Sequence, residues 1–185
     1  MYGMVNQALE DMLIERFGRP AWEKVKSEAG VRVEVFISNN AYPDQTTYSL
    51  VDAASRTLGM TAEEILRGFG RYWILKTARD GYGELLNMGG GNLPEFLQNL
   101  PTFHTRISLI FPHLQPPRFI CQQITETSLR LHYYSDRPGL APFVEGLLEG
   151  LGSMFKTPVR VLQEGFTGQG LDHDLFLVEW EREPS

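Results

Sequence analysis

The sequence predicts an α+β fold in which a helical N-terminal part precedes a group of strands crossed by one helix. Three observations support this prediction. In roughly the first 110 residues, apolar side chains recur at spacings of three and four, which is typical of amphipathic helices. Residues 118–134 and 158–180 alternate between apolar and polar side chains, which is typical of half-buried strands. Residues 139–155 return to helical spacing, so we expect a helical lobe followed by an antiparallel sheet with crossing helices.

Length and composition indicate one globular domain with a core of ordinary size. The chain has 185 residues, of which 42% are hydrophobic and 22% charged, and its formal net charge is −6. The negative charge argues against nucleic acid as a partner. The start of the chain lacks the features of a signal peptide, and no run of 18 apolar residues predicts a membrane span. Because the single cysteine, Cys121, excludes an intrachain disulfide, we expect a cytoplasmic protein without a membrane partner.

The first 80 residues contain capping and helix-ending residues typical of short helices. Gly18 can end a first helix that begins near Val5, and Thr61 with Glu64 has the spacing of a capping box. The alternation in VRVEVFI predicts a strand, whereas SNNAYPDQTT predicts a loop. The expected elements are helices at about 5–17, 20–30, 49–58 and 61–78, a strand at 31–37 and a loop at 38–47.

The next helix carries the first unusual residue. After a glycine-rich break at 85–93, Asn92 is a good N-cap, Glu95 follows it by three residues, and Pro112 marks the far end. Pro101 has no N–H to donate, so we expect a bend there. The apolar face of this helix is formed by Leu97, Leu100, His104, Ile107 and Phe111.

The second half of the chain reads as two strand pairs around a helix. Strands are expected at 118–124, 128–134, 158–166 and 174–180, with the helix at 139–155. Cys121, in the first of these strands, is expected to be a small buried hydrophobic residue, and His173, next to a turn, is expected to be solvated.

Familiar catalytic and nucleotide-binding motifs are absent from the sequence. GGGNLP lacks the Lys-Ser/Thr of a phosphate-binding loop, and neither a dinucleotide fingerprint nor HExxH occurs. With one cysteine, a structural zinc site is not expected either.

His104 stands in the middle of an apolar helix face, where an imidazole needs a partner. Leaving it buried and unpaired costs about 1–3 kcal/mol. It is either a core histidine bonded to a backbone carbonyl, which periodicity alone favours, or an axial ligand of a haem iron.

The second unusual feature is Tyr133-Tyr134-Ser135-Asp136-Arg137. Because side chains alternate along a strand, Tyr133, Ser135 and Arg137 project to one face. A phenol, a hydroxyl and a guanidinium together suit a ligand that bears carboxylates. The alternative is a strand that simply leaves the core for solvent.

Together, these two features resemble the H-NOX family, the haem nitric oxide/oxygen-binding module also found at the N-terminus of the β subunit of soluble guanylate cyclase. The resemblance extends from MYGMVNQALE through SLVDAASRTLG, EFLQNL and HYYSDR to LFLVEW. It implies a single H-NOX domain over 1–185, with a helical lobe at about 1–60, the remainder at about 61–185 and the haem between the two lobes.

The resemblance also implies the cofactor and its ligands. His104 corresponds to the proximal ligand of a non-covalently bound haem b, and Tyr133, Ser135 and Arg137 to the residues that bind its propionates. Pro117 corresponds to the proline that distorts the porphyrin. No Cys-x-x-Cys-His is present, which excludes covalent attachment of a c-type haem. Further pocket-lining positions are Tyr2, Val5, Leu9, Trp73, Tyr82, Leu100, Phe111, Phe143 and Leu147.

Gas selectivity is expected to depend on the side of the haem opposite His104. Phe143 stands where O2-binding members carry a tyrosine, and it has no hydrogen-bond donor. The resemblance therefore implies a sensor of NO and CO that discriminates against O2, unless the Trp73 N–H serves as a donor and makes the chain an O2-binding H-NOX. NO is expected to release His104 and so to signal in trans to a histidine kinase or a cyclic-dinucleotide enzyme.

Two other classes of function remain as alternatives. One is a haem peroxidase or oxygenase, although Phe143 and Trp73 supply no acid–base group, so we expect no enzymatic activity. The other is a haem-free interaction domain in which His104 is structural.

Overall fold

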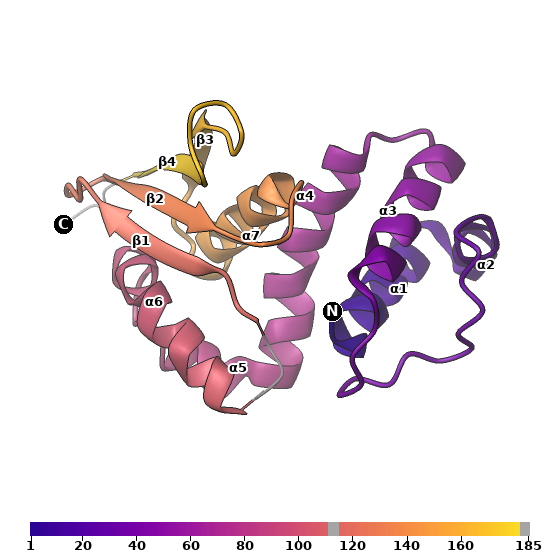
Figure 1. Ribbon diagram of the computed structural model, residues 1–185. Coiled ribbons are helices and arrows are strands. Elements are labelled where there is room, and N and C mark those ends of the chain that lie inside the picture. Colours follow the sequence, from indigo (N-terminus) through magenta and orange to yellow (C-terminus); the bar gives the residue numbers. More distant parts are fainter. Residues whose placement is uncertain (111–114, 182–185) are drawn as a thin grey trace.

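The structure is a computed structural model that describes residues 1–110 and 115–181. A group of helices formed by the first part of the chain stands on one side, and a four-stranded sheet with its covering helices stands on the other (Figure 1). Helices α4 and α7 lie between these two parts (Figure 1). The α+β fold class predicted from the sequence is confirmed.

The helical part consists of α1 (Gly3–Phe17), α2 (Arg19–Glu28) and α3 (Asp44–Leu58). Gly18 separates the first two helices with a φ of 83°, as its position predicts. The expected loop at 38–47 is wrong at its end, since α3 begins at Asp44, directly after Pro43. An acidic residue in the first turn of a helix is favoured by the helix dipole, which explains the earlier start.

The strand predicted at 31–37 is wrong. Phe36 is 1% exposed while its neighbours Val35 and Ile37 are 72% and 57% exposed, so the buried side chain is out of phase with the alternation in the sequence. This segment is held by side-chain hydrogen bonds and not by pairing with a neighbouring strand. Gln7 Nε2, for example, donates to the Phe36 carbonyl at 2.5 Å. The backbone carbonyls of Asn40 and Ser38 accept the N–H groups of the first two residues of α1, which have no partner within the helix.

The helix predicted at 61–78 is longer than expected. Thr61 and Glu64 form the capping box before α4 (Ala62–Tyr72), which continues as a π-helical segment η1 (Trp73–Ala78) and then as α5 (Arg79–Asn87). The backbone kinks at Tyr82, where φ is −141°. Residues 85–87, expected in the glycine-rich break, are therefore helical.

Helix α6 (Leu93–Ile110) begins as predicted. Asn92 Oδ1 accepts the backbone N–H of Glu95 at 2.9 Å, and Pro101 lies inside the helix. Pro112, its predicted end, lies outside the described residues. No helix within 1–110 and 115–181 is both long and apolar enough to cross a membrane.

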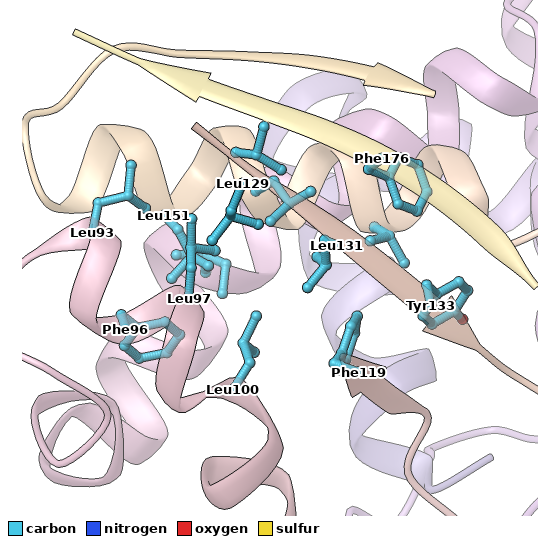
Figure 2. Packing of buried hydrophobic residues seen from close by; sticks show 14 of the residues in the cluster. Leu93, Phe96, Leu97, Leu100, Phe119, Leu129, Leu131, Tyr133, Leu151 and Phe176 are labelled. Atoms are coloured by element: carbon cyan, nitrogen blue, oxygen red, sulfur yellow. The ribbon is translucent and has the colours of Figure 1, made fainter. Parts of the chain in front are cut away.

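The sheet consists of the predicted strands. Its order is β1 (Arg118–Gln122), β2 (Ser128–Tyr134), β4 (Asp174–Trp180) and β3 (Val159–Gly165), with antiparallel pairs throughout. Helix α7 (Ala141–Met154) crosses between β2 and β3. Figure 2 shows Leu97 and Leu100 of α6 on one side of a shared apolar core and Leu131 of β2 on the other.

Two hydrophobic clusters form the core. One gathers buried residues of α1, α2, α3 and α4, and the other those of η1, α5, α6, α7 and the sheet. Trp73 packs against both. Between them α4 and α7 cross at very short distance, since a Cβ on Gly146 would lie 2.1 Å from the Arg67 carbonyl oxygen. Ion pairs between Arg67 and Glu145 and between Arg71 and Glu149 flank this crossing.

Replacing Gly146 by Ala should therefore destabilise the fold. The added methyl group forces α4 and α7 apart, and overpacking of this kind costs about 1–3 kcal/mol. Gly81→Ala in α5 is the matched control, because a Cβ there meets nothing within 4 Å. Urea unfolding is the measurement, and equal midpoints for both variants would show that the crossing is not tight.

Candidate functional site

His104 lies on α6, one turn after Leu100, with one ring nitrogen fixed by the helix. Its Nδ1 lies 3.0 Å from the Leu100 carbonyl oxygen. Because a carbonyl only accepts, Nδ1 carries the hydrogen and Nε2 carries the lone pair. Nε2 makes no hydrogen bond to any residue within 1–110 and 115–181. The bond expected of a core histidine is thus present, but it uses only one of the two nitrogens.

The surroundings of His104 keep its imidazole neutral. Burial lowers the pKa of His104 below its ordinary value of 6.5, and the hydrogen bond to Leu100 opposes this only in part. The ring lies against Phe119 of β1, with 4.9 Å between centroids, and near Phe103, at 5.8 Å. A neutral imidazole with a free lone pair among aromatic side chains is suited to bind a metal ion within an apolar pocket.

The backbone carbonyl that Pro101 leaves without a helical hydrogen bond is satisfied by a side chain. Pro101 has no N–H for the carbonyl of Leu97, four residues earlier. That carbonyl instead accepts the thiol of Cys121 on β1, with 3.2 Å between Sγ and oxygen. Burial raises the pKa of Cys121 to about 11, so the thiol keeps the proton that it donates. Cys121 is therefore half-buried and hydrogen-bonded, and it holds the first half of α6 against the sheet.

Tyr133, Ser135 and Arg137 come together at the end of β2, and we call them the anion clamp. Tyr133 is 5% exposed and contacts Phe119, with 5.4 Å between ring centroids (Figure 2). Burial raises the pKa of Tyr133, and a hydrogen bond with Ser135 partly opposes the rise. Ser135 Oγ accepts the backbone N–H of Arg137 at 3.1 Å. The three residues are thus linked through Ser135, but β2 ends at Tyr134, so that Ser135 and Arg137 lie beyond the strand and their predicted alternation onto one face with Tyr133 stays a prediction.

The guanidinium of Arg137 reaches across to the helical part of the molecule. Its Nε donates to Asp44 Oδ2 of α3 at 2.8 Å, and Nη1 donates to the carbonyl of Gln115 at 2.9 Å. The amine of Met1 also binds Asp44. Burial alone raises the pKa of Asp44, but the bonds from Met1 and Arg137 outweigh it, so the pKa is lowered.

A cleft of about 300 Å³ opens at the solvent side of the anion clamp. Pro117, which the resemblance places against a porphyrin, lines this cleft together with Ser135 and Arg137, whereas Tyr133 does not. The remaining lining residues are Gln115, Pro116, Arg118, Tyr134, Asp136 and Asp172.

Aromatic side chains gather where the two hydrophobic clusters meet. Phe69 of α4 lies 5.1 Å from Phe143 of α7 and 6.1 Å from Trp73 of η1, measured between ring centroids. Phe143 packs with the first cluster and Leu147, one turn later, with the second.

The other residues predicted to line a pocket are spread over both clusters. Leu9 and its neighbour Val5 belong to the first cluster, and Leu100 belongs to the second. Tyr2 is buried, and the Tyr82 hydroxyl lies 3.6 Å from the sulfur of Met4. Phe111 lies outside the described residues. Their contact with a ligand stays a prediction.

The residues present fit a haem on three counts. His104 offers an unshared Nε2 lone pair, which can bind an iron. The anion clamp offers hydrogen-bond donors and a positive charge. Phe69, Trp73 and Phe143, where the two clusters meet, offer uncharged aromatic surfaces. Tyr133 links the first two features through Phe119, which contacts both rings.

Sequence reasoning missed two residues of this site. Phe119 alternates inward with Cys121 on β1, so strand periodicity contained a signal for it. Asp44 is 93 residues from Arg137, and no local pattern indicates that the two side chains meet.

Comparisons with known proteins agree with this geometry. The family model described as "Haem-NO-binding" matches residues 2–163. Soluble guanylate cyclase gcy-34 of Caenorhabditis elegans is 28% identical over 197 residues, which cover 100% of this chain and 29% of that protein. The chain therefore spans less than a third of the length of that relative.

Solved structures share the fold. An H-NOX protein from S. oneidensis in the Fe(II)NO ligation state has a TM-score of 0.88 at 20% identity, and the match covers 98% of this chain and 100% of that one. An Fe(II) unliganded H-NOX protein from K. algicida has a TM-score of 0.87 at 20% identity, covering 100% and 99%. At this identity the likeness establishes the fold alone.

Replacing Asp44 by Asn should weaken the link between α3 and the anion clamp. Asp44 is partly exposed, so we expect a loss of about 0.5–1 kcal/mol at pH 7. Because its pKa is lowered on folding, its contribution is present above the ordinary value of 3.8 and is lost as the pH falls through the lowered value. Urea unfolding at pH 7 and pH 3 measures both effects.

The control for this variant is Asp52→Asn, an exposed position on the same helix. The unfolding free energies of wild type and Asp44→Asn should converge at low pH. A deficit that does not shrink between pH 7 and pH 3, or an equal one in the control, would contradict the assigned role of Asp44.

Proposed function

The chain belongs to the haem-NO-binding, or H-NOX, family of gas-sensing haem domains, and on this basis we propose that it senses NO and CO at ferrous haem b and discriminates against O2. One observation carries the proposal: His104 is a neutral imidazole whose Nδ1 is fixed by Leu100 and whose Nε2 is free of other described residues. When bound, the haem would supply an iron that can bind a diatomic gas, with His104 as the residue that holds the iron.

The proposed role of His104 depends on how α6 holds it. A bond from Nδ1–H to a carbonyl fixes the ring orientation of a metal-bound histidine and increases the basicity of Nε2. In this chain Leu100 supplies that carbonyl from within the same helix. The imidazole is therefore oriented before any ligand arrives.

The anion clamp is proposed to bind the two propionates. Tyr133 and Ser135 provide hydroxyl donors, and Arg137 provides a charge that cannot be lost near neutral pH. Nη2 of Arg137 makes no hydrogen bond to a residue within the described ranges, so it remains able to donate to a carboxylate while Nε holds Asp44. The clamp thus joins the ligand to α3.

Gas selectivity is proposed to follow from the aromatic side chains of Phe69, Trp73 and Phe143, which we call the aromatic junction. A hydrocarbon ring at Phe143 donates no hydrogen bond, and polar O2 complexes need such a donor more than NO complexes do. Phe69 lies beside it with the same character. The indole N–H of Trp73 is the one donor in this group of three, and an O2-binding sensor is the outcome if it points to the gas.

Signalling is proposed to begin when gas binding releases His104. The first half of α6 is held by the bond from Cys121 to the Leu97 carbonyl, whereas the half that carries His104 lies beyond Pro101. Movement is thus expected to concentrate in that second half. A switch requires a partner that contacts the two states differently, and the resemblance suggests a histidine kinase or a cyclic-dinucleotide enzyme in the cytoplasm.

We infer that the chain is a sensor rather than a haem enzyme. Peroxidase or oxygenase chemistry needs an acid–base group beside the gas or a thiolate ligand. Phe69, Phe143 and Trp73 offer no such group, and Cys121 holds its proton because burial raises its pKa to about 11. Steady peroxide turnover by the haem-loaded chain would favour the enzyme.

His104→Gly should abolish tight haem binding, and imidazole added to the solution should restore it. Imidazole can occupy the cavity left by the side chain and supply the missing nitrogen. Absorbance titration with ferrous haem measures affinity, with imidazole added to wild type as the control. An unchanged affinity and spectrum in the variant would exclude ligation by His104.

Phe143→Tyr should create measurable O2 binding that the wild-type chain lacks. The added hydroxyl supplies a hydrogen-bond donor at the aromatic junction, where a good charge-assisted bond is worth about 1.5–3 kcal/mol, or roughly 10- to 150-fold in affinity. Absorption spectra of the ferrous proteins in air, then with NO and with CO, measure it. Phe155→Tyr, in the second cluster, is the control.

A wild-type chain that binds O2 stably in air would contradict the proposed selectivity and favour the role of Trp73 as a donor. Failure to take up haem at all would favour a haem-free interaction domain.

A further inference from the structure

The outer face of the sheet carries a linked set of side chains that the proposed haem site does not use. His132 Nδ1 on β2 lies 2.7 Å from His173 Nε2, and His173 Nδ1 lies 2.7 Å from Asp172 Oδ1. His173 was expected to be solvated, but it is only 8% exposed. It is buried because the ring of Tyr134 stacks on it, with 4.3 Å between centroids. We call Asp172, His173 and His132 the histidine brace.

Asp172, the exposed residue of the brace, determines which ring nitrogens of His173 and His132 carry hydrogen. The Asp172 carboxylate accepts, so His173 carries its hydrogen on Nδ1 and presents the Nε2 lone pair to His132. His132 must then donate from Nδ1. A single added proton on the far nitrogen of His132 leaves this chain intact. A second added proton places two N–H groups opposite each other and breaks the bond between the rings.

The brace is not arranged as a metal site. Asp172 and His132 bind opposite nitrogens of His173, so the three groups do not converge on one point. No set of three metal-ligating side chains occurs among residues 1–110 and 115–181. Hydrogen bonding and stacking are therefore what this geometry provides.

Tyr134 connects the brace to the anion clamp. It lies between Tyr133 and Ser135 in sequence and points to the opposite face of the sheet. Besides His173, the guanidinium of Arg118 on β1 lies over its ring, 3.8 Å from the centroid. The end of β2 is thus held on its outer face by two stacking contacts, one of which belongs to the brace.

We propose that the histidine brace positions the anion clamp and that its protonation loosens the clamp. The consequence for haem retention rests on the proposed function, whereas the brace itself does not. Breaking the bond between His132 and His173 frees the ring that stacks on Tyr134, and the strand end that carries Ser135 and Arg137 loses that support.

Charges around the brace determine its response to acid. Burial, then the repulsion that a protonated His173 would exert and the charge of Arg130, lower the pKa of His132 below its ordinary value of 6.5. Arg130 is partly neutralised by Glu164 of β3, at 2.7 Å. The other charged groups at this face are Arg118 on β1, Asp136 in the cleft, and Asp172 and Asp174 beside β4, of which Asp174 accepts from Gln163 and Thr167.

The direction of the pH effect follows from this lowered pKa. The unfolded chain takes up the proton near pH 6.5, whereas the folded chain takes it up only at lower pH. Between these values the unfolded state binds more protons, so stability falls as the pH falls through the window. The brace is therefore closed at neutral pH, survives the first proton on His132, and opens when acid adds the second proton and places two N–H groups opposite each other.

The first experiment tests the brace without reference to haem. Nitrogen-15 NMR of histidine-labelled protein should show His173 and His132 with hydrogen on Nδ1 at pH 7.5, and their signals should change together on acidification. His173→Phe keeps a ring to stack on Tyr134 but removes both hydrogen bonds. Proton uptake on unfolding, from the pH dependence of urea unfolding, should fall by up to about one proton in this variant.

Asp172→Asn is a second variant that keeps an acceptor but removes the charge, and Asp136→Asn is the control in the same cleft. Independent titration of His132 and His173, or proton uptake in His173→Phe equal to that of wild type, would overturn the brace.

The second experiment tests its effect on the clamp. Transfer of haem to excess apomyoglobin is measured at pH 7.5 and 5.5 for the haem-loaded chain. Protons also compete with the iron for His104 in every variant. The quantity compared between proteins is therefore the rate of haem transfer at pH 5.5 divided by the rate at pH 7.5. One hydrogen bond is worth about 0.5–1.5 kcal/mol, so His173→Phe should reduce this ratio by about two- to tenfold relative to wild type and Asp136→Asn.

Equal ratios in all three proteins would overturn the link between brace and clamp. If the chain takes up no haem, the proposed function fails, and the NMR and unfolding measurements alone decide whether the brace exists.

Discussion

An imidazole with an unshared lone pair among aromatic side chains is the constraint on which the rest of this structure depends. A buried imidazole nitrogen that is left unpaired costs about 1–3 kcal/mol. Leu100 satisfies one nitrogen of His104 from within the helix, the other nitrogen has no partner among the described residues, and the ring lies against Phe119. The proline one turn earlier, the thiol of Cys121 and the sheet beneath all keep this ring in place.

The two hydrophobic clusters are joined along the interface between α4 and α7, by Trp73, which packs against both, and by an ion pair. At one place α4 and α7 touch backbone to backbone around Gly146, which leaves little freedom to slide. At another, Asp44 of the helical part binds Arg137 at the end of β2. If Arg137 binds the ligand as proposed, the same guanidinium would join that ligand to α3 through Asp44. Such an arrangement is what a switch between two states requires.

Much of this could be predicted from the sequence because it is local. Helix caps such as Asn92, the strand that carries Tyr133, and the position of His104 on its helix all follow from short-range geometry. What failed depends on distant partners. The segment around Phe36 alternates like a strand but has no strand to pair with, and the ion pair of Asp44 spans 93 residues. His173 is buried by Tyr134, which the turn beside it does not reveal.

The bond between His104 and iron is the central claim, and resonance Raman spectroscopy of the ferrous, gas-free, haem-loaded chain tests it most directly. The account predicts an iron–nitrogen stretching band that shifts when histidine alone is labelled with nitrogen-15. It also predicts that this band disappears when NO is added, as His104 leaves the iron. A spectrum without any band sensitive to the histidine label would contradict the account.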